Sequence, residues 1–397
     1  MNKIHVIILN YEPQFSDGRV VRVKALVRYL ALKGKDVYLY SFSNVSQTTK
    51  KDGFTHVEVK YPGMGMLMSD RPVGRESNVM KRMVLAISRV IYPDRYLFGI
   101  PLIHGRLQKN VSRGDALILS CPWFSVLLLA LYPIVLRKKL KLILDYRDLW
   151  VNNPIFARGS VQRLIASWLE GVVLKRSCAV SVTTTSAAKY FEVKGARTIL
   201  VSNGINLSDF SKISSINCQL SEDSHRLKLG YFGNIGNKRD CKDLLQNIID
   251  AKIELSLYGN LDLAHLVVCG QSYHGKLDRD ESLLRASECS FLLIVIRKNE
   301  NSDFAIPGKV YECILLRKPI LLYCPSDALV LTYLVELSYP HFHVESEKNV
   351  DLHSCIQQFV IFSKSLDYSS LNKHYEVPIR EHEFSKLDQL FGESLTS

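Results

Sequence analysis

The chain has 397 residues, which is too long for one typical hydrophobic core and predicts two or three domains. Hydrophobic residues make up 47% of the chain and charged residues 23%, as in ordinary soluble globular proteins. The longest apolar run, residues 126–136, is interrupted by Tyr132 and Pro133 and falls well short of the ~20 residues that span a bilayer. The composition therefore argues against an integral membrane protein.

The charge is distributed unevenly. Residues 1–205 hold 31 Lys and Arg against 13 Asp and Glu, a net charge of +18, whereas the remainder carries −6. A strongly cationic half predicts contact with an anionic surface, either nucleic acid or anionic lipid. The sequence contains no RNA-binding aromatic motif, zinc finger or clear recognition-helix pattern. We therefore expect an anionic membrane surface, and no nucleic acid, as a partner.

The amino terminus and the cysteines indicate the compartment. The first three residues lead directly into an apolar strand at 4–9, without the apolar core and cleavage site of a signal peptide. The nine cysteines form no CxxC pair and lie mostly within apolar stretches, which favours core-filling thiols over disulfides or a metal site. We expect a cytoplasmic protein, peripheral at the inner face of the cell membrane, with no metal.

Short apolar strands alternate with helical stretches in the first half, which predicts a parallel sheet covered by helices on both faces. The helix expected at 18–33 has an apolar face and ends at Gly34, a residue that commonly terminates helices. Two further cover helices are expected at 122–136 and 161–176. The expected strands are 4–10, 36–41, 115–119, 141–145, 179–183 and 198–201.

The alternation stops in a polar stretch at 210–225 and then begins again, which predicts two doubly wound α/β domains. We expect an N-terminal domain at 1–205, a linker at 206–225 and a C-terminal domain at 226–375, with 376–397 packing back as a helix on the first domain. The strands expected in the second domain are 227–232, 253–257, 290–296 and 319–323, and its helices include 242–249, 328–337 and 350–363.

Residues 61–105 depart from this alternation. Methionines and aromatic residues are mixed there with lysines and arginines, outside the expected sheet. Such a mixture suits a segment that lies on a membrane surface. A pair of cover helices with solvated arginines is the other interpretation, and the pattern alone does not choose between them.

In a doubly wound sheet, ligands bind outside the carboxyl ends of the parallel strands, so the loops there are candidate sites. In the first domain these loops are 10–19, which contains Asp17, 145–150, and 202–205. Charges at such an edge are costly unless paired, so Arg147 is expected to pair with Asp145 or Asp148. The charges either tie the strand end to its neighbours or position a substrate.

In the second domain, Gly233 and Asn234 open a glycine-bearing turn that continues to Lys238 and Arg239. Backbone amides and two cations there could hold phosphates, although neither a P-loop nor a GxGxxG pattern is present. A tight turn that merely needs glycine is the alternative. The other strand-end loops expected in this domain are 258–260 and 274–277.

The segment 304–321 reads as a loop, a short helix and a strand. Pro307 suits the first turn of a helix because the amide that it lacks would have been unpaired there. The amides from Gly308 to Val310 would point out of the helix start, where the dipole favours an anion. Glu312 follows in the same turns, so a phosphate and a sugar hydroxyl could be held close together. The segment suggests a nucleotide-diphosphate site, with an ordinary αβ unit as the alternative.

Together these loops resemble the family-4 glycosyltransferases, retaining nucleotide-sugar enzymes of GT-B architecture, over nearly the whole chain. The resemblance implies two Rossmann-like domains that face a cleft, and a bacterial surface-polysaccharide enzyme with a lipid-linked or glycan acceptor. The stretches that carry it are 16–19 with 34–37, D-x-R-D-x-W at 145–150, V-S-N-G-I at 201–205, 230–234, and P-G-K-V-Y-E at 307–312.

The resemblance also implies roles for individual residues. The C-terminal domain would bind the nucleotide sugar, and the N-terminal domain the acceptor. The donor-site residues that it implies are Gly233, Asn234, Lys238, Arg239, His274, Lys276, Pro307, Gly308, Lys309 and Glu312. On the acceptor side it implies Asp17, Arg19, Arg147 and Asp148. Asp148 is the best candidate for positioning or deprotonating the acceptor.

Phe304 departs from the family pattern, because many members carry there an acidic residue that is often assigned to the donor sugar. The donor sugar therefore stays open. No D-x-D metal motif is present, so we expect cations to stabilise the departing diphosphate without a metal or other cofactor. Two further functions remain open: a nucleotide-sugar 2-epimerase of the same architecture, and a non-catalytic scaffold in a polysaccharide assembly complex.

Overall fold

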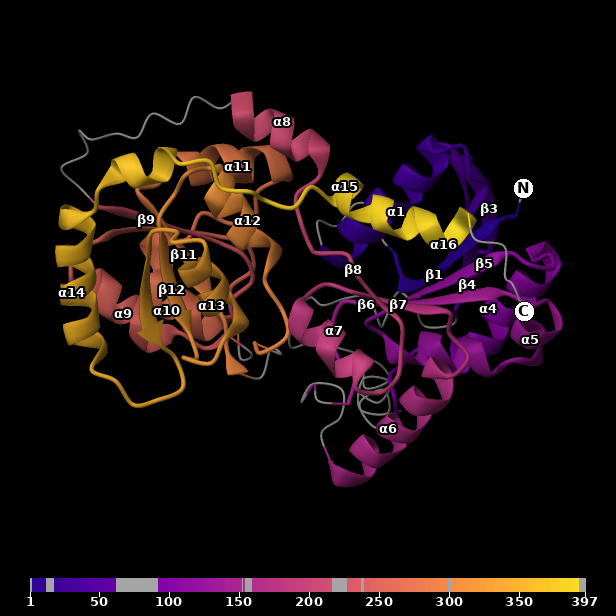
Figure 1. Cartoon of the computed structure of the whole chain (residues 1–397). Helices are drawn as coiled ribbons and strands as arrows, with labels where there is room; N and C mark the ends of the chain where they lie inside the picture. Colours follow the sequence, from indigo (N-terminus) through magenta and orange to yellow (C-terminus); the bar gives the residue numbers. More distant parts are fainter. Residues whose placement is uncertain are drawn as a thin grey trace. The chain divides into compact units, whose positions relative to one another are not determined.

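The computed structural model describes residues 2–11, 18–61, 92–151, 153, 159–215, 227–236, 239–298 and 302–392. The chain divides into two compact units, each an α/β structure built on its own sheet (Figure 1). Unit 1 comprises residues 1–202 and 380–397, and unit 2 comprises residues 203–379. The carboxyl-terminal residues thus return to the unit in which the chain begins.

The sheet of unit 1 has the order β3-β4-β2-β1-β5-β6-β7-β8. Its neighbouring strands are parallel except for β3 and β4, which form an antiparallel hairpin. The expectation of a purely parallel sheet is therefore wrong at one edge. β3 is polar and fully exposed, so it lacks the apolar signal of a strand. The strands are β1 (Ile4–Asn10), β2 (Val37–Ser43), β3 (Gln47–Lys51), β4 (Phe54–Lys60), β5 (Ala116–Ser120), β6 (Lys141–Tyr146), β7 (Ala179–Val182) and β8 (Thr198–Leu200).

Helices flank this sheet as the alternation predicts, with one correction. The helix expected at 122–136 is a 3-10 helix, Phe124–Leu131, followed at Pro133 by a separate helix. Proline has no amide and disfavours a helical conformation at the residue before it, so the two segments are separated at Tyr132. The helices that precede the return of the chain are α1 (Gly18–Leu32), α4 (Ile100–Asn110), α5 (Pro133–Arg137), α6 (Ser160–Leu174) and α7 (Thr185–Glu192).

The carboxyl-terminal segment packs against α1. Phe384, Leu387 and Leu390 are buried in the same core cluster as residues of α1 and β1. The Tyr29 hydroxyl donates to Asp388 at 2.6 Å. The single helix expected within 376–397 is wrong for the described residues, because the segment consists of α15 (Arg380–Phe384), a 3-10 turn (Ser385–Leu387) and α16 (Asp388–Gly392).

A buried arginine joins three elements of unit 1. Arg22 of α1 is 2% exposed and donates to the carbonyl oxygens of Val201 at 2.9 Å and Ser202 at 3.2 Å. Its guanidinium also lies 3.5 Å from the carboxylate of Asp145. Contacts between residues so far apart in the sequence leave no local signal. The helix pattern therefore did not predict that Arg22 is buried.

Replacing Arg22 with methionine is expected to destabilise unit 1 by about 3 kcal/mol, because the buried Asp145 carboxylate loses this counter-charge. Urea unfolding of the full chain, followed by circular dichroism, measures the change. Arg28→Met is the matched control on the same helix: its ion pair with Asp52 is solvent-exposed, so a cost below about 1 kcal/mol is expected. Equal costs for the two variants would contradict the structural importance of the buried pair.

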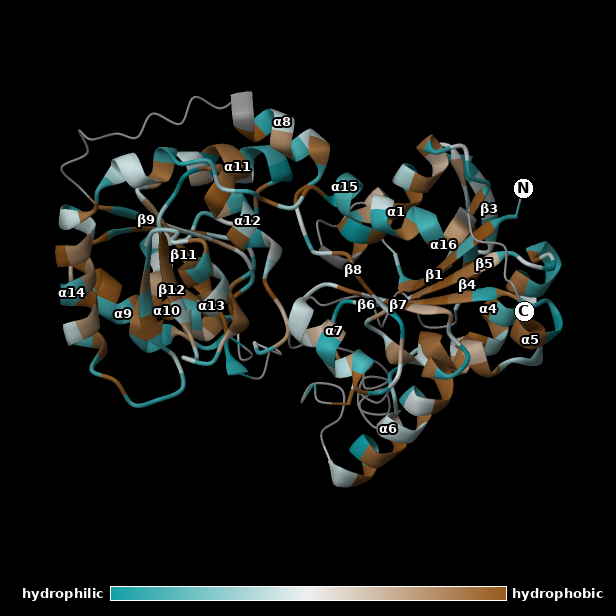
Figure 2. Cartoon of the chain, viewed as in Figure 1, coloured by the Kyte–Doolittle hydropathy of each residue, from teal (hydrophilic) through white to brown (hydrophobic). Residues whose placement is uncertain are grey.

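The sheet of unit 2 is entirely parallel, with the order β10-β9-β11-β12-β13. Two hydrophobic clusters occupy its faces, and Figure 2 shows the hydrophobic strands between the cover helices. β13 and α8 were not expected: β13 has two half-buried histidines, and α8 lies in the stretch assigned to a linker. The strands are β9 (Lys228–Phe232), β10 (Glu254–Tyr258), β11 (Phe291–Val295), β12 (Ile320–Cys324) and β13 (His341–Glu345).

In unit 2, the strands are joined in parallel crossovers by the second to the sixth of its seven described α-helices. The seven helices are α8 (Leu207–Ser215), α9 (Lys242–Asp250), α10 (Leu263–Cys269), α11 (Arg279–Ser287), α12 (Gly308–Leu315), α13 (Leu329–Glu336) and α14 (Leu352–Ser365). Over the described part of the chain, no helix combines the length and apolar character that crossing a membrane requires.

Candidate functional site

Three loops converge at the carboxyl edge of the sheet in unit 2. Gly233 follows β9, Gly259 follows β10, and Lys309 lies in the first turn of α12. The amide of Gly233 donates to the carbonyl oxygen of Tyr258 at 2.8 Å, and the amide of Gly259 to that of Gly275 at 2.9 Å. The Lys309 ammonium lies 2.6 Å from the point where a Cβ on Gly233 would stand. Doubly wound α/β sheets bind ligands at the carboxyl ends of their strands, which is where these loops meet.

Gly259 is the glycine that this convergence most requires. Its φ of +126° lies in a region that L side chains rarely adopt. A Cβ at this position would also stand 1.9 Å from the carbonyl oxygen of Gly233, which no backbone contact tolerates. The two strand-end loops can therefore approach one another only because residue 259 has no side chain.

The start of α12 differs by one position from the expectation. Pro307 is the N-cap residue, with φ −61° and ψ 136°, and the helix begins at Gly308. The amide of Val310 donates to the carbonyl oxygen of Pro307 at 3.0 Å, so it is not available to a ligand. The helix start therefore offers the amides of Gly308 and Lys309, which have no acceptor within an α-helix.

Lys309 is an ammonium in surroundings that disfavour its charge. Burial lowers the pKa of Lys309 to about 8; the Glu312 carboxylate opposes this shift, and the guanidinium groups of Arg239 and Arg279 add to it. Its ammonium lies 5.6 Å from the ring centroid of Tyr231, whose hydroxyl donates to the carbonyl of Asn234 at 3.1 Å. A ligand anion at this point would supply the negative charge that the cluster lacks.

Glu312 is oriented by an ion-pair chain that the sequence did not reveal. Arg279 of α11 donates to Glu312 Oε1 at 2.8 Å and to Asp209 of α8 at 3.0 Å. Burial alone would lower the pKa of Arg279, but Glu312 and Asp209 outweigh it and raise the pKa above its usual value. The Glu312 carboxylate is thus held in one orientation, and its Oε2 has no protein partner among the described residues.

Aromatic rings flank the same edge. Tyr258, the last residue of β10, stacks on Phe232 with centroids 4.9 Å apart and on His274 with centroids 5.0 Å apart. His274 is exposed, so its outer face is open to a planar group. Asn234 accepts hydrogen bonds from Asn260, which links the loops after β9 and β10. Lys276 is exposed close by in the sequence, and Lys238 lies outside the described residues.

The candidate residues of unit 1 lie at the carboxyl edge of its own sheet. Asp145 is bound by the hydroxyls of Ser120 at 2.8 Å and Ser181 at 3.1 Å, in addition to Arg22. Arg147 is buried and donates through Nε to the carbonyl of Cys121. Asp148 is half-buried, and Asp17 lies outside the described residues.

Trp150 belongs to the core of unit 1 rather than to a ligand site. It is fully buried and stacks on Phe124 with an interplanar angle of 2° and centroids 5.3 Å apart. The aromatic residue of the D-x-R-D-x-W stretch therefore anchors the loop that carries Arg147 and Asp148. This packing is the structural reason for an aromatic side chain at the end of that stretch.

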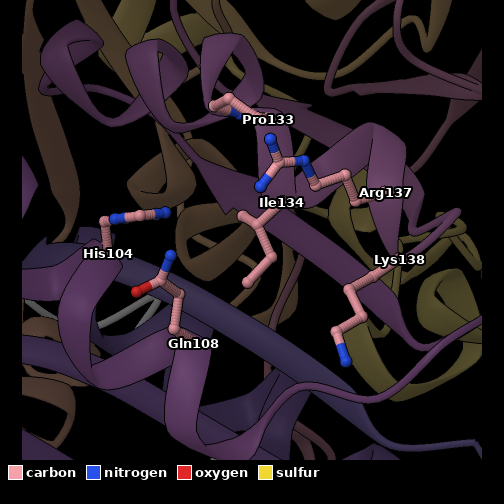
Figure 3. A pocket seen from close by; sticks show the side chains of 6 residues that line it. All are labelled: His104, Gln108, Pro133, Ile134, Arg137 and Lys138. Carbon is pink, nitrogen blue, oxygen red and sulfur yellow. The ribbon is translucent and has the colours of Figure 1, made fainter.

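A pocket of about 450 Å³ lies elsewhere in unit 1 (Figure 3). Its lining comes from α4 and α5, and it includes Gln108, Arg137 and Lys138. The amide of Gly114 donates to the carbonyl of Lys138 just before β5, which places this pocket near the amino ends of the strands. Ligands of doubly wound sheets bind at the opposite edge, so the strand-end loops remain the better candidate.

The described residues contain no cluster of histidine, cysteine and carboxylate side chains that could hold a metal ion. The carboxyl edge of unit 2 instead brings cations together: Arg239 and Arg279 act on the charge of Lys309, and Arg279 also pairs with Glu312. This arrangement can bind a phosphate through positive charge and a hydroxyl through the carboxylate.

The whole chain is similar to solved glycosyltransferase structures. Sucrose-phosphate synthase from Thermosynechococcus elongatus aligns with a TM-score of 0.62 at 12% identity, over 98% of this chain and 95% of its own. WaaG, a glycosyltransferase involved in lipopolysaccharide biosynthesis, aligns with a TM-score of 0.56 at 11% identity, over 99% and 96%. Anabaena HepE, solved in complex with UDP, aligns with a TM-score of 0.52 at 13% identity, over 93% and 97%.

No protein-family model matches the chain, and no curated protein matches its sequence significantly. The likeness to the solved structures nevertheless extends over both units, and it confirms the expected fold: two Rossmann-like domains of the GT-B type. The identities of 11–13% support the fold alone, so the activity has to be argued from the residues of this chain.

Proposed function

We propose that this protein is a retaining glycosyltransferase that moves a sugar from a nucleotide-diphosphate donor to a glycan acceptor. The observation that carries the proposal is the cluster of Lys309, the α12 start and the Arg279–Glu312 pair at the strand ends of unit 2. It combines cations and amides for a diphosphate with an oriented carboxylate for hydroxyls. The GT-B fold supports it, since HepE, a protein of similar structure, was solved with UDP.

Each group has a distinct task in this proposal. The amides of Gly308 and Lys309, with the Lys309 ammonium and Arg239, hold the diphosphate. Glu312, oriented by Arg279, accepts hydrogen bonds from the ribose hydroxyls. The base lies near His274. When the bond between the anomeric carbon and the β-phosphate oxygen breaks, the diphosphate leaves with the bonding electrons, and the cations and amides stabilise its developing charge.

The acceptor side belongs to unit 1 in this proposal. The acceptor hydroxyl attacks the anomeric carbon from the face that the diphosphate leaves, which retains the configuration. Its proton passes to the departing phosphate or to a carboxylate, for which Asp148 is the candidate. Arg147 and Asp17 are proposed to line the acceptor site.

We further propose that the acceptor is linked to a lipid and that the protein works at the cytoplasmic face of a membrane, in surface-polysaccharide synthesis. The support is the charge of residues 1–205, which is +18. An anionic lipid surface attracts such a domain with about 1 kcal/mol per cation that lies close to it. Most of the segment 61–105, the first candidate for membrane contact, lies outside the described residues.

Replacing Glu312 with alanine is expected to weaken UDP or GDP binding roughly tenfold, because two ribose hydroxyls lose a charged acceptor. Isothermal titration calorimetry on the full chain measures the change. Glu336→Ala, which removes an exposed glutamate at the end of α13, is the matched control and should bind as the wild type does.

Nucleotide binding and turnover together distinguish the transferase from the epimerase and the scaffold. Absence of heat with either nucleotide would contradict the enzyme and favour a scaffold. Conversion of a nucleotide sugar without any acceptor would instead indicate a 2-epimerase. Transfer that needs both donor and acceptor supports the proposal.

A further inference from the structure

Helix α6 of unit 1 exposes a continuous apolar stripe. Val161, Leu164, Ile165 and Trp168 are 70%, 72%, 42% and 67% exposed. Their spacing of i, i+3, i+4 and i+7 places all four on one face of the helix. Figure 2 shows the hydrophobic residues along this helix. Single exposed apolar residues are common on soluble proteins, but an aligned set that includes a tryptophan marks an interaction surface.

The other face of α6 is fixed to the body of unit 1. Ala166, Glu170 and Val173 are buried, and Glu170 is bound by Lys194 at 2.5 Å and by the hydroxyl of Tyr190 at 2.8 Å. Burial raises the pKa of Glu170, opposed by the Lys194 ammonium. Because α7 holds the buried face in this way, the apolar stripe is directed away from the core.

The residues of the stripe include no carboxylate, and the charge on its face is positive. Glu170 is the only carboxylate in α6, and it is buried and paired. Lys175, the C-cap residue, is exposed and continues the i, i+7 spacing of Val161 and Trp168, so it lies on the face of the stripe. The stripe therefore presents apolar side chains with a tryptophan, followed by Lys175 at the end of the helix, on the cationic part of the chain. A helix with this pattern suits the headgroup region of an anionic bilayer, where the apolar side chains enter the acyl boundary and Lys175 meets the headgroups.

We propose that α6 is a membrane-docking surface for anionic lipid, with Val161, Leu164, Ile165 and Trp168 inserted into the interface. Charge complementarity favours this occupant over a second copy of the chain, because residues 1–205 carry a net charge of +18 and two such surfaces repel one another. The inference rests on the membrane location proposed above and assigns it to a described helix. It does not depend on the donor site of unit 2.

Vesicle flotation of the full chain tests the docking surface. The probe is a liposome with about 30% anionic phospholipid in phosphatidylcholine, compared with phosphatidylcholine alone. We expect Leu164→Glu/Trp168→Glu to reduce the bound fraction at least tenfold, because both substitutions place carboxylates in the interface. The matched control is Leu263→Glu/Val267→Glu on α10 of unit 2, two residues with the same i, i+4 spacing that are 79% and 85% exposed. The control should bind as the wild type does.

Tryptophan fluorescence gives a second, site-specific measurement. Trp150 is fully buried and Trp123 partly buried, so Trp168 is the tryptophan of this chain that the bilayer should affect most. Vesicles are expected to shift the emission to shorter wavelength in the wild type. Trp168→Phe should lose this shift while still floating with the vesicles, because it keeps an apolar side chain at the same position.

Several results would overturn the inference. They are a wild type that binds no vesicles, equal binding by the α6 double variant, equal binding to neutral vesicles, and a dimer in ultracentrifugation that the α6 substitutions dissociate. Nucleotide binding is measured in parallel on the same variants. If the wild-type protein does not bind UDP but binds vesicles, the proposed transferase is contradicted and α6 docking is not. If it binds UDP but no vesicles, α6 docking alone is contradicted.

Discussion

Replacing Lys309 with methionine is expected to weaken nucleoside-diphosphate binding roughly 10- to 100-fold, because a charge-assisted hydrogen bond to the diphosphate is lost. Calorimetry with UDP and GDP measures the change. Lys364→Met, at an exposed position near the end of α14, is the control and should leave the dissociation constant unaltered. Unchanged binding in Lys309→Met would remove the ammonium from the proposed phosphate site.

The same substitution should stabilise the unliganded protein, and the effect should depend on pH. The pKa of Lys309 is lowered from 10.5 to about 8 in the folded state. Below pH 8 both states hold the proton, so the folded state carries the full cost of the buried charge. Between pH 8 and about 10.5 the unfolded state binds more protons, and wild-type stability recovers as pH rises. The advantage of the methionine variant should therefore be largest below pH 8, up to about 3 kcal/mol, and should vanish near pH 10.5.

Donor affinity should follow the opposite trend with pH. A diphosphate favours the protonated ammonium, so wild-type binding should weaken by up to about tenfold per pH unit above pH 8. Binding at pH 8 should also take up protons, which calorimetry in buffers of different ionisation enthalpy detects. In Lys309→Met both effects should disappear. Persistence of the same pH profile in the variant would assign the titration to another group.

Replacing Gly259 with alanine is expected to destabilise unit 2 by about 3 kcal/mol or more. The added Cβ would stand 1.9 Å from the carbonyl oxygen of Gly233, and φ at this residue is +126°. The hydrogen bond from the Gly233 amide to the Tyr258 carbonyl, 2.8 Å long, restrains both backbone segments. The strain and the collision therefore act together. Thermal unfolding of the full chain measures the cost, and UDP binding measures the displacement of the site.

Gly275→Ala is the matched control for this prediction. Gly275 also has a positive φ, +85°, but a Cβ there would meet no atom within 4 Å. Its substitution should cost only the conformational penalty of about 1–2 kcal/mol and should leave the donor loops in place. If the two alanine variants proved equally stable, the close approach of the loops after β9 and β10 would be contradicted.

The segment around α12 shows how far local chemistry carries a prediction. A proline followed by glycine correctly indicated a helix start with outward amides, because the preferences of both residues act within one turn. The position was wrong by one residue, and the Val310 amide proved to be bonded to Pro307. Caps depend on the conformation of a single residue, which the surrounding structure decides.

The partners of the charged residues were not predictable in the same way. Arg279 lies 33 residues before Glu312 and pairs with it, and Asp209 lies a further 70 residues before Arg279 in a stretch that reads as a linker. Asp145 finds its counter-charge in Arg22 of α1. A carboxylate at a strand end predicts that a cation will pair with it. The crossover geometry determines which distant cation lies close enough to do so.

The sequence by itself determined the alternation of elements, the two-domain α/β class and the strand-end loops that carry Gly233 and Lys309. Hydrophobic periodicity and the conformational preferences of glycine and proline act over a few residues, so they can be recognised in the sequence. Only the tertiary structure decided that Lys309 stands beside Gly233 with its pKa lowered, that Glu312 is oriented by Arg279, and that α6 presents its apolar face outward. Burial and long-range pairing exist only once the sheet has brought distant segments together.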